Sequence, residues 1–378
     1  MKLLVIGSGL SGAVLANKFA RAGKKVIVLE KREQIAGNVF DKKISGVTVH
    51  KYGPHIFHTN NEEVNKYMNQ FWKLNEFKNR VEGKVVGQLI PIPFNFLGID
   101  KFWPNESTEI KNKLILKFGE DTKITIFQML EEKDEQLKKV ADFIYKNIIE
   151  NYTSKMWGKK PSEIDESVIK RVPITIGYGT RYFSDKYEGI PKEGYTSAVA
   201  KMLDHKNIEV RLNINAVSVL EVKDSKIYFE NLEVTCPIIY TGALDEFFGY
   251  KYGALSYRSL KFRFKELQQK QYQNTAVVNY PADEFMTRIT EYKNMTFEDT
   301  ESTIISIEYP GAFDVKSEDY NVPYYPMAND KSRAQYNKYK KIADNYENFY
   351  PLGRLAEFKY LNMDQIVANA LELANKIL

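Results

Sequence analysis

Three glycines near the start of the chain have the spacing of a diphosphate-binding turn. Gly7, Gly9 and Gly12 occupy the glycine positions of G-x-G-x-x-G, and Glu30 is the next acidic residue along the chain. Gly7 permits a tight turn, Gly9 lets the backbone approach a pyrophosphate, and Gly12 lets a helix pack closely on a strand. A carboxylate at position 30 would accept hydrogen bonds from an adenosine ribose. The pattern predicts a dinucleotide site.

This chemistry requires particular elements around the glycines. Residues 2–6 form a short apolar run, "AVLANKFARAG" has apolar residues at helical spacing, and "KKVIVLEKR" is a second strand of the buried type. Strand, glycine turn, helix and strand in this order make a βαβ unit. The start of its helix offers free N–H groups and a partial positive charge to phosphates. The fingerprint alone does not distinguish NAD from FAD.

The C-terminal segment bears on that choice. "PLGRLAEFKYLNMDQIVANALELANKIL" predicts a strand that ends near Gly353, then a turn, then an amphipathic helix from about Asp364. Flavoproteins of the two-dinucleotide-binding type commonly return at the C-terminus to place such a helix start against the flavin. The segment therefore favours FAD, although a docked terminal helix with no special role would give the same pattern.

Composition limits the class of protein. A chain of 378 residues is long enough for two or three domains. Its 54 Lys and Arg exceed its 49 Asp and Glu by only 5, which suits an anionic small molecule and argues against nucleic acid. The single cysteine, Cys236, excludes an internal disulfide and a cysteine-based zinc site. We find no signal-peptide core and no apolar membrane span, and therefore expect a cytoplasmic protein.

Three histidines lie close together in "VHKYGPHIFHTN". Their spacing raises a metal hypothesis, but a Gly-Pro step separates His50 from His55, and no H-x-x-x-H spacing occurs on a helix. We therefore expect no metal. A loop near the cofactor, with His55 or His58 hydrogen-bonded to a ligand, explains the cluster better. The sequence has neither a G-x-S-x-G nucleophile elbow nor a P-loop lysine.

The middle of the chain does not continue the βα alternation. Most windows over residues 61–155 have helical spacing, residues 208–240 alternate as strands, and residues 260–309 indicate an antiparallel sheet. We predict an α/β protein with a Rossmann-like FAD-binding domain, a helical insertion domain and an antiparallel β-sheet substrate domain. The predicted boundaries are 1–65 with 190–258 and 331–378 for FAD binding, 66–150 for the helical insertion, and 151–189 with 259–330 for the substrate domain and a mobile lid.

A series of unusual short motifs occurs in collinear order from Gly7 to about Asp364. They are "KYGPHIFHTN", "YTSKMWG", "RVP" followed by "TRYF", "GIPKEGY", "TRITEYK", "VPYYP" and "GRLAEFKYLNMD". Together they closely resemble UDP-galactopyranose mutase, a bacterial FAD-dependent family. Such a series is far more specific than the glycine fingerprint.

The resemblance implies a non-redox use of flavin. Enzymes of this family are isomerases that reversibly convert UDP-galactopyranose to UDP-galactofuranose. This reaction is a step towards galactofuranose in cell-surface polysaccharides. Only reduced FAD is active, and its N5 attacks the anomeric carbon, so the cofactor supplies the nucleophile. The resemblance further implies a cellular reductant such as NAD(P)H and, by analogy with bacterial members, a homodimer.

The resemblance also assigns residues. Arg171 and Arg288 are the catalytic arginines expected on the diphosphate, because a guanidinium matches phosphate oxygens better than an ammonium does. Tyr182 stacks on uracil. The other substrate-binding residues are Tyr152, Trp157, Asn279, Tyr324, Tyr360, Asn362 and His58. The cofactor-binding residues are Gly7, Gly9, Leu10, Ser11, Gly12, Glu30, Lys31, Asn38, His55, Gly353, Arg354 and Met363.

Some positions depart from the family pattern or have no assigned role. The second flavin motif has Ala36 where glycine is usual, and we expect an alanine to be small enough for this place. Asn362 stands where many members have aspartate, which leaves its role open. Arg181 is either a solvated charge or an anchor for its loop.

Two other functions share these features. One is an FAD oxidoreductase of the amine-oxidase type, and the other is a nucleotide-sugar-binding protein with a structural flavin. The sequence also leaves open whether the sugar carries an N-acetyl group.

Overall fold

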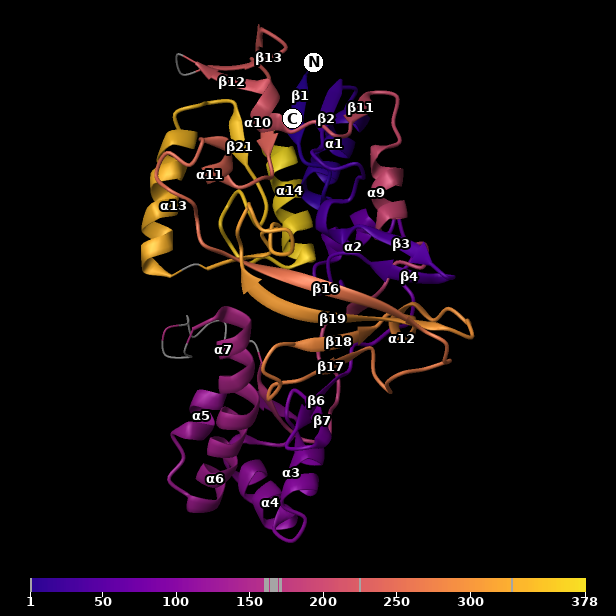
Figure 1. Cartoon of the computed structure of the whole chain (residues 1–378), viewed down its shortest axis with the longest axis vertical. Helices are drawn as coiled ribbons and strands as arrows, with labels where there is room; N and C mark the ends of the chain where they lie inside the picture. Colours follow the sequence, from indigo (N-terminus) through magenta and orange to yellow (C-terminus); the bar gives the residue numbers. More distant parts are fainter. Residues whose placement is uncertain (1, 160–162, 164–168, 170–171, 224–225, 328) are drawn as a thin grey trace.

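The computed structural model describes residues 2–159, 163, 169, 172–223, 226–327 and 329–378. Figure 1 shows three regions along the longest axis of the molecule. An α/β region holds both chain termini, a long antiparallel sheet crosses the middle, and a group of helices lies at the opposite end.

A five-stranded parallel sheet forms the centre of the α/β region. Its strand order is β11-β2-β1-β15-β21. The strands are β1 Leu3–Ile6, β2 Val26–Leu29, β11 Ile208–Arg211, β15 Ile238–Tyr240 and β21 Phe349–Pro351, and every neighbouring pair is parallel. All four residues of β1 are buried, which is typical of a sheet covered on both faces.

Alternate residues of β1 enter two different cores. Leu3 and Val5 pack into a core that includes α1 Leu10–Arg21, α9 Tyr195–Leu203 and α14 Met363–Ile377. Leu4 and Ile6 pack on the other face. The elements on that face are α10 Ala216–Val219, α11 Leu244–Phe247, α13 Asp330–Ala343 and the small sheet of β12 Leu220–Lys223, β13 Lys226–Phe229 and β14 Leu232–Glu233. The predicted Rossmann-like architecture is confirmed.

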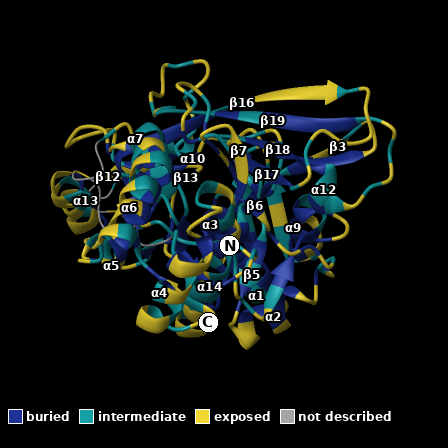
Figure 2. Ribbon diagram, turned by 90° about the horizontal axis from the view of Figure 1, so that it is seen from below, coloured by how far each residue is buried: buried dark blue, intermediate teal, exposed yellow. Residues whose placement is uncertain are grey.

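The second large sheet is antiparallel apart from one strand pair. Its order is β20-β16-β19-β18-β17-β6-β7, and only β6 and β17 are parallel. The strands are β20 Tyr325–Pro326, β16 Tyr257–Leu267, β19 Thr303–Ala312, β18 Arg288–Glu291, β17 Val277–Asn279, β6 Val81–Val85 and β7 Gln88–Ile92. In Figure 2 the outer end of β16 is exposed, whereas β19 beside it is largely buried.

The hairpin of β6 and β7 corrects one expectation. Helix was predicted across residues 66–150, but residues 81–85 and 88–92 are strands that extend the antiparallel sheet. Val86 and Gly87 form the two-residue turn between them, both with positive φ. Pro91 is tolerated because β7 is an edge strand.

Helices follow this hairpin, as predicted. They are α3 Phe96–Phe102, α4 Ser107–Phe118, α5 Ile126–Leu130 and α6 Glu135–Ile144, and α6 continues through a π-helical turn, η2 Tyr145–Glu150, into α7 Asn151–Trp157. Side chains of Asn95, Thr125 and Asp134 cap the starts of α3, α5 and α6. Such π turns frequently occur at functional sites.

Smaller elements complete the chain. They are η1 Gly37–Val39, β3 Asp41–Ile44, β4 Val47–His50, β5 Phe57–Thr59, α2 Glu62–Met68, β8 Thr122–Ile124, β9 Ile174–Ile176, β10 Tyr187–Gly189 and α12 Lys293–Thr296. None of the helices in the described part of the chain is long and apolar enough to cross a membrane.

Candidate functional site

A cavity lies at the carboxyl ends of β1, β2 and β15, which is where open α/β sheets bind their ligands. Eleven of the twelve residues predicted to bind the cofactor line this cavity, namely Gly7, Gly9, Leu10, Ser11, Glu30, Lys31, Asn38, His55, Gly353, Arg354 and Met363. The twelfth, Gly12, lies behind the cavity wall. A Cβ at Gly12 would be 1.9 Å from the carbonyl oxygen of Gly7, so this glycine permits helix α1 to approach the turn.

The glycine turn leaves room for a ligand beside Gly9 but not beside Gly7. Gly7 has φ +99°, and a Cβ there would be 2.1 Å from Oγ1 of Thr241. A Cβ at Gly9 would meet only the Cα of Gly37, at 3.9 Å. Gly9 precedes the first residue of α1 and has no side chain to cap the helix. Free helix N–H groups beside an open backbone are the features that a diphosphate needs.

Glu30 is held rigidly at the end of β2. Its Oε2 accepts hydrogen bonds from the backbone N–H of Ser8 at 2.9 Å and from the Ser8 hydroxyl at 2.7 Å. Its Oε1 accepts from the backbone N–H of Arg32 at 3.0 Å. The carboxylate is 5% exposed and borders the cavity. This geometry presents an oriented acceptor to a ribose.

Arg32 lines the same cavity and was not singled out in the sequence. Its Nη2 donates to Oδ1 of Asn38 at 2.9 Å, and its guanidinium lies 4.3 Å above the ring of Tyr52. Its Nη1 is buried without a hydrogen-bond partner. The sequence could have indicated Arg32, because this residue lies only two positions after Glu30, the acidic residue that follows the second strand.

Ala36 also lines the cavity, in a conformation that its small size does not explain. It is fully buried and has φ +74°, in the left-handed region where glycine is favoured. The expectation that a small side chain suits this place considered only volume. The constraint lies in the backbone, so alanine carries a conformational cost here.

In the described part of the chain, three residues form the partition between this cavity and a second one. His55, Arg354 and Met363 line both. Nδ1 of His55 lies 2.8 Å from the carbonyl oxygen of Gly53, which makes Nδ1 the protonated nitrogen and leaves Nε2 as an acceptor. Burial lowers the pKa of His55 to about 3, so the imidazole is neutral at neutral pH.

Arg354 is fixed by two tyrosines and a carbonyl group. Its guanidinium lies 5.4 Å from the ring centre of Tyr325 and 5.0 Å from that of Tyr360, and these two rings stack at 5.2 Å. Its Nη2 donates to the carbonyl oxygen of Leu361 at 2.6 Å. A cation therefore lies where the two cavities meet.

The second cavity encloses about 580 Å³ between the antiparallel sheet and the η2–α7 helix. The register of the strands arranges the residues of the cavity floor in two rows across the sheet. Val277 pairs with Val81, which pairs with Ile92, and all three line the cavity. In the next row Asn279 pairs with Arg288, and Arg288 pairs with Glu308. One end of the floor is therefore aliphatic and the other polar.

Most of the predicted substrate residues reach this cavity. Those that line it are His58, Tyr152, Tyr182, Asn279, Arg288, Tyr360 and Asn362. Oδ1 of Asn279 is buried without a hydrogen-bond partner, so a polar group is available for a ligand. Asn362 precedes α14, where its backbone N–H donates to Oε1 of Gln365 at 2.9 Å.

Two predicted substrate residues lie outside the cavity lining. Tyr324 is 4% exposed and packs beside Tyr52 and Phe262. Trp157 lies 6.3 Å from the ring of Tyr325, within the same small cluster. Both support cavity residues from behind, and direct contact with a substrate remains a prediction. Arg171 and part of the predicted lid lie outside the described residues.

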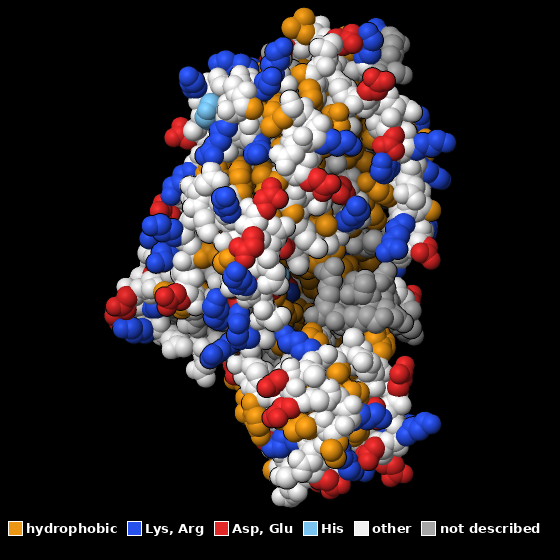
Figure 3. Space-filling view, turned by 180° about the vertical axis from the view of Figure 1, so that it is seen from behind, with side chains coloured by type: hydrophobic (Ala, Val, Ile, Leu, Met, Phe, Trp, Pro, Cys, Tyr) orange, Lys and Arg blue, Asp and Glu red, His pale blue; other side chains and the backbone are white. Residues whose placement is uncertain are grey.

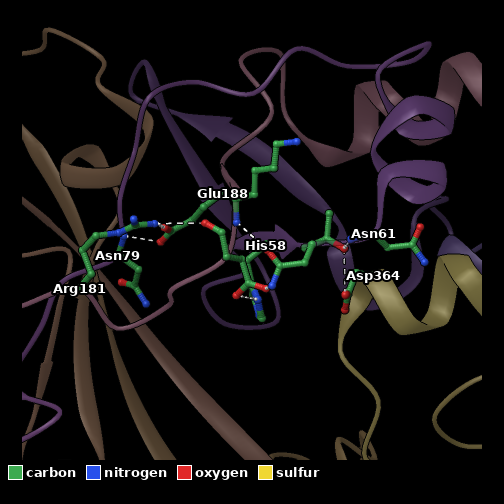
Figure 4. A network of polar contacts seen from close by, with 10 residues as sticks. His58, Asn61, Asn79, Arg181, Glu188 and Asp364 are labelled. Atoms are coloured by element: carbon green, nitrogen blue, oxygen red, sulfur yellow. Dashed lines mark hydrogen bonds and ion pairs between the residues drawn. The ribbon is translucent and has the colours of Figure 1, made fainter. Parts of the chain in front are cut away.

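A polar network connects the loop after β9 to the start of α14 (Figure 4). His58 Nδ1 lies 3.0 Å from Asp185, and its ring stacks on Phe183 at 3.7 Å. Next to His58, the Thr59 hydroxyl donates to Asp364 of α14 at 3.1 Å. The network thereby fixes the orientation of one of the cavity's histidines.

Arg181 belongs to the same network. Its Nη2 donates to Oε2 of Glu188 at 2.6 Å, and Oε1 of Glu188 accepts from the backbone N–H of Asn79 at 2.6 Å. The carboxylate of Glu188 is fully buried. Of the two roles considered for Arg181, the structure supports the loop anchor, and Asn79 joins the cavity lining as a residue that the sequence did not reveal.

Seen from behind, the molecular surface is hollowed where the α/β region meets the helical region, and hydrophobic side chains are visible inside (Figure 3).

A family model for UDP-galactopyranose mutase matches residues 147–360, and one for an NAD(P)-binding Rossmann-like domain matches residues 5–71. The chain is 37% identical over 382 aligned positions to UDP-galactopyranose mutase of Mycoplasma pneumoniae, covering 99% of this chain and 96% of that protein.

The chain belongs to the UDP-galactopyranose mutase family.

Other relatives extend the comparison. A dTDP-fucopyranose mutase of Escherichia coli is 35% identical over 381 positions, covering 99% of this chain and 97% of that one. The fold resembles the crystal structure of a reduced UDP-galactopyranose mutase, with a TM-score of 0.72 at 16% identity, covering 100% and 93% of the two chains. A redesigned putrescine oxidase shares the fold with a TM-score of 0.59 at 12% identity, covering 100% and 98%. Similar folds thus occur under differently named activities.

Proposed function

We propose that this member of the UDP-galactopyranose mutase family is an FAD-dependent isomerase that interconverts UDP-galactopyranose and UDP-galactofuranose. One observation carries the proposal. Among the residues that the structure describes, three line both the cavity at the glycine turn and the larger cavity that contains Arg288, namely His55, Arg354 and Met363. A cofactor and an anionic substrate would meet at these residues.

The residues of the first cavity fit FAD. The open side of Gly9 and the start of α1 would hold its diphosphate, and Glu30 would hold its ribose. Reduced flavin bound there would supply the nucleophile for the anomeric carbon. Glu30 and its backbone donors would fix the adenosine end, while His55 and Arg354 would border the end nearest the sugar.

Residues of the second cavity would bind the nucleotide diphosphate. The Arg288 side chain is 24% exposed at the cavity and pairs with Glu308, so it would present a permanent cation to phosphate oxygens. Tyr152 is bonded to the same guanidinium and would approach the diphosphate from α7. The aliphatic row with Tyr182 would bind the pyrimidine. The sugar would then lie at the partition between the two cavities, and the bound nucleotide would exclude water from the sugar.

The resemblance contributes the homodimer and a reductant such as NAD(P)H to the proposal. The sequence pattern contributes a cytoplasmic location and the three units predicted above, with one change to their boundaries. We assign the β6–β7 hairpin to the substrate unit, because its strands complete the sheet that forms the cavity floor.

A product assay tests the proposal. Dithionite-reduced protein is incubated with UDP-galactofuranose, the products are separated by chromatography, and oxidised protein is the control. We expect UDP-galactopyranose in the reduced sample only. Net oxidation of the substrate with peroxide formation would instead indicate an oxidase, and nucleotide binding without product would indicate a binding protein. UDP-N-acetylgalactosamine and dTDP-fucose in parallel samples would define the sugar and the base.

A further inference from the structure

Lys155 lies on the cavity side of the molecule but has no role in the site described so far. It belongs to the motif "YTSKMWG" and sits one helical turn after Tyr152 on α7. Tyr152 lines the second cavity, whereas Lys155 points past it to the loop between β17 and β18.

The ammonium group of Lys155 is occupied by three backbone carbonyl groups of that loop. Its Nζ donates to Tyr280 at 2.7 Å, to Asp283 at 2.6 Å and, more weakly, to Pro281 at 3.4 Å. An ammonium has three donors. Because all three are directed to the loop, this cation is not available to the phosphates of a substrate.

The loop that Lys155 holds is well ordered by its own hydrogen bonds. The backbone N–H of Tyr280 donates to Thr287 at 2.9 Å and closes the hairpin. Oδ1 of Asp283 accepts from the N–H groups of Phe285 at 2.8 Å and Met286 at 2.7 Å. The two residues that flank this hairpin are Asn279 and Arg288, both of which line the cavity.

A second cation holds α7 from the other side. Arg258 of β16 is buried, and it donates to the carbonyl oxygens of Met156 at 2.7 Å and Lys155 at 3.2 Å. Gly158 ends the helix with φ +64°, and a Cβ there would be 2.9 Å from Nη1 of Arg258. The last turn of α7 is therefore fixed to β16 by its backbone and to the β17–β18 hairpin by the Lys155 side chain.

We propose that Lys155 is a positioning residue that sets the distance between Tyr152 on α7 and the Asn279–Arg288 pair on the sheet, and thereby the affinity of the second cavity for a nucleotide diphosphate. The inference rests on the proposed function for the identity of the ligand. Lys155 acts through its hairpin contacts and does not touch the substrate.

The test compares Lys155→Met with Lys155→Arg and with the surface control Lys201→Met, whose amine pairs with the exposed Glu193. The readouts are UDP affinity by calorimetry, flavin content, KM and kcat on the reduced enzyme. We expect Lys155→Met to weaken UDP binding and raise KM about tenfold, with flavin content unchanged and kcat within about twofold. Lys155→Arg should recover most of the affinity, and Lys201→Met should match the parent.

A pH profile adds a signature that a merely structural lysine would not give. Burial lowers the pKa of Lys155 to about 8, and the carboxylate of Asp283 opposes this effect. Among the described residues, Arg258 on β16 is a further charged group at this turn, and it stays charged. UDP binding by the parent should therefore weaken above about pH 8, and the loss should be absent in Lys155→Met.

Several outcomes would overturn the inference. One is an affinity for UDP that does not change in Lys155→Met. Another is a lower kcat in Lys155→Met without any change in its affinity for UDP. If Lys155→Met fails to fold, Asp283→Ala tests the same hairpin from the loop side and should weaken UDP binding in the same direction. An absence of turnover in the parent together with the predicted change in UDP affinity would refute the proposed reaction and leave the positioning role intact.

Discussion

Nη2 of Arg288 lies 2.8 Å from the hydroxyl of Tyr152, so a cation of the sheet and a phenol of α7 meet across the second cavity. Nε of Arg288 lies 3.0 Å from Oε1 of Glu308, which is itself 2% exposed. Burial alone would lower the pKa of Arg288, but Glu308 together with the hydroxyl groups of Tyr152, Tyr325 and Tyr182 holds the pKa well above its usual range. The cation is part of the fold as well as part of the site.

We expect Arg288→Ala to fail in two measurable ways. It removes the proposed contact with the diphosphate, and it leaves Glu308 buried without its cation, which typically costs about 3–5 kcal/mol of folding free energy. Arg288→Lys keeps the charge without the planar fork, so kcat/KM should fall while stability changes less. Urea unfolding and steady-state kinetics separate the two effects. In a double variant, Arg288→Met with Glu308→Gln, stability should recover and activity should not. Retained activity in Arg288→Ala would refute the assignment.

Gly9→Ala and Gly12→Ala should give different losses. A Cβ at position 9 has open space apart from Gly37, so the chain should fold but bind the flavin diphosphate poorly. A Cβ at position 12 would clash with the carbonyl of Gly7 and should impair folding itself. Flavin absorbance per protein and the melting temperature of cofactor-free protein distinguish the two. Normal flavin content in Gly9→Ala would place the diphosphate elsewhere.

Ala36→Gly should stabilise the protein. Alanine at φ +74° carries a left-handed penalty of about 1 kcal/mol, which glycine relieves in part because it also loses more entropy on folding. We expect an unfolding free energy higher by about 0.5 kcal/mol, with flavin affinity equal or better. Ala16→Gly, in the interior of α1, is the control and should be destabilising. A loss of stability in Ala36→Gly would mean that the methyl contributes more through packing.

Acid should destabilise the fold through its buried histidines. Burial lowers the pKa values of His50 and His55 to about 3 from an ordinary value of 6.5. The unfolded chain then takes up protons below pH 6.5 that the folded chain does not. The free energy of unfolding therefore keeps its full value above pH 6.5. It decreases from there towards pH 3, by up to about 1.4 kcal/mol per pH unit for each histidine.

His50→Gln tests this dependence, because an amide oxygen can still accept from the backbone N–H of His55. The variant should lose stability less steeply than the parent in urea unfolding at pH 7, 6 and 5. Parallel curves for the two proteins would contradict the expectation.

The sequence predicts the local parts of the site well. Gly7, Gly9 and Glu30 belong to one continuous βαβ unit, whose geometry follows from short-range rules. The strand before Gly353 and the final helix also agree with prediction, since both have clear apolar periods. These patterns depend only on neighbours in the chain.

The parts that depend on distant pairing were not predictable in the same way. Val81 and Ile92 form the aliphatic end of the cavity only because β6 lies beside β17, almost 200 positions away in the chain. Their hairpin was missed because Val86, a residue unusual at positive φ, occupies its turn. The depth of Tyr324 behind the cavity and the pairing of Arg181 with Glu188 likewise follow from tertiary contacts.

The first cavity takes its walls from both ends of the chain. Gly7 and Glu30 leave the ribosome more than 300 residues before Gly353, Arg354 and the α14 residue Met363. Until then β15 lacks its partner β21, and the face of α1 that packs on α14 is bare. We therefore expect flavin to bind only after α14 has been synthesised, and a truncation that removes α14 should lower the flavin absorbance of the purified protein.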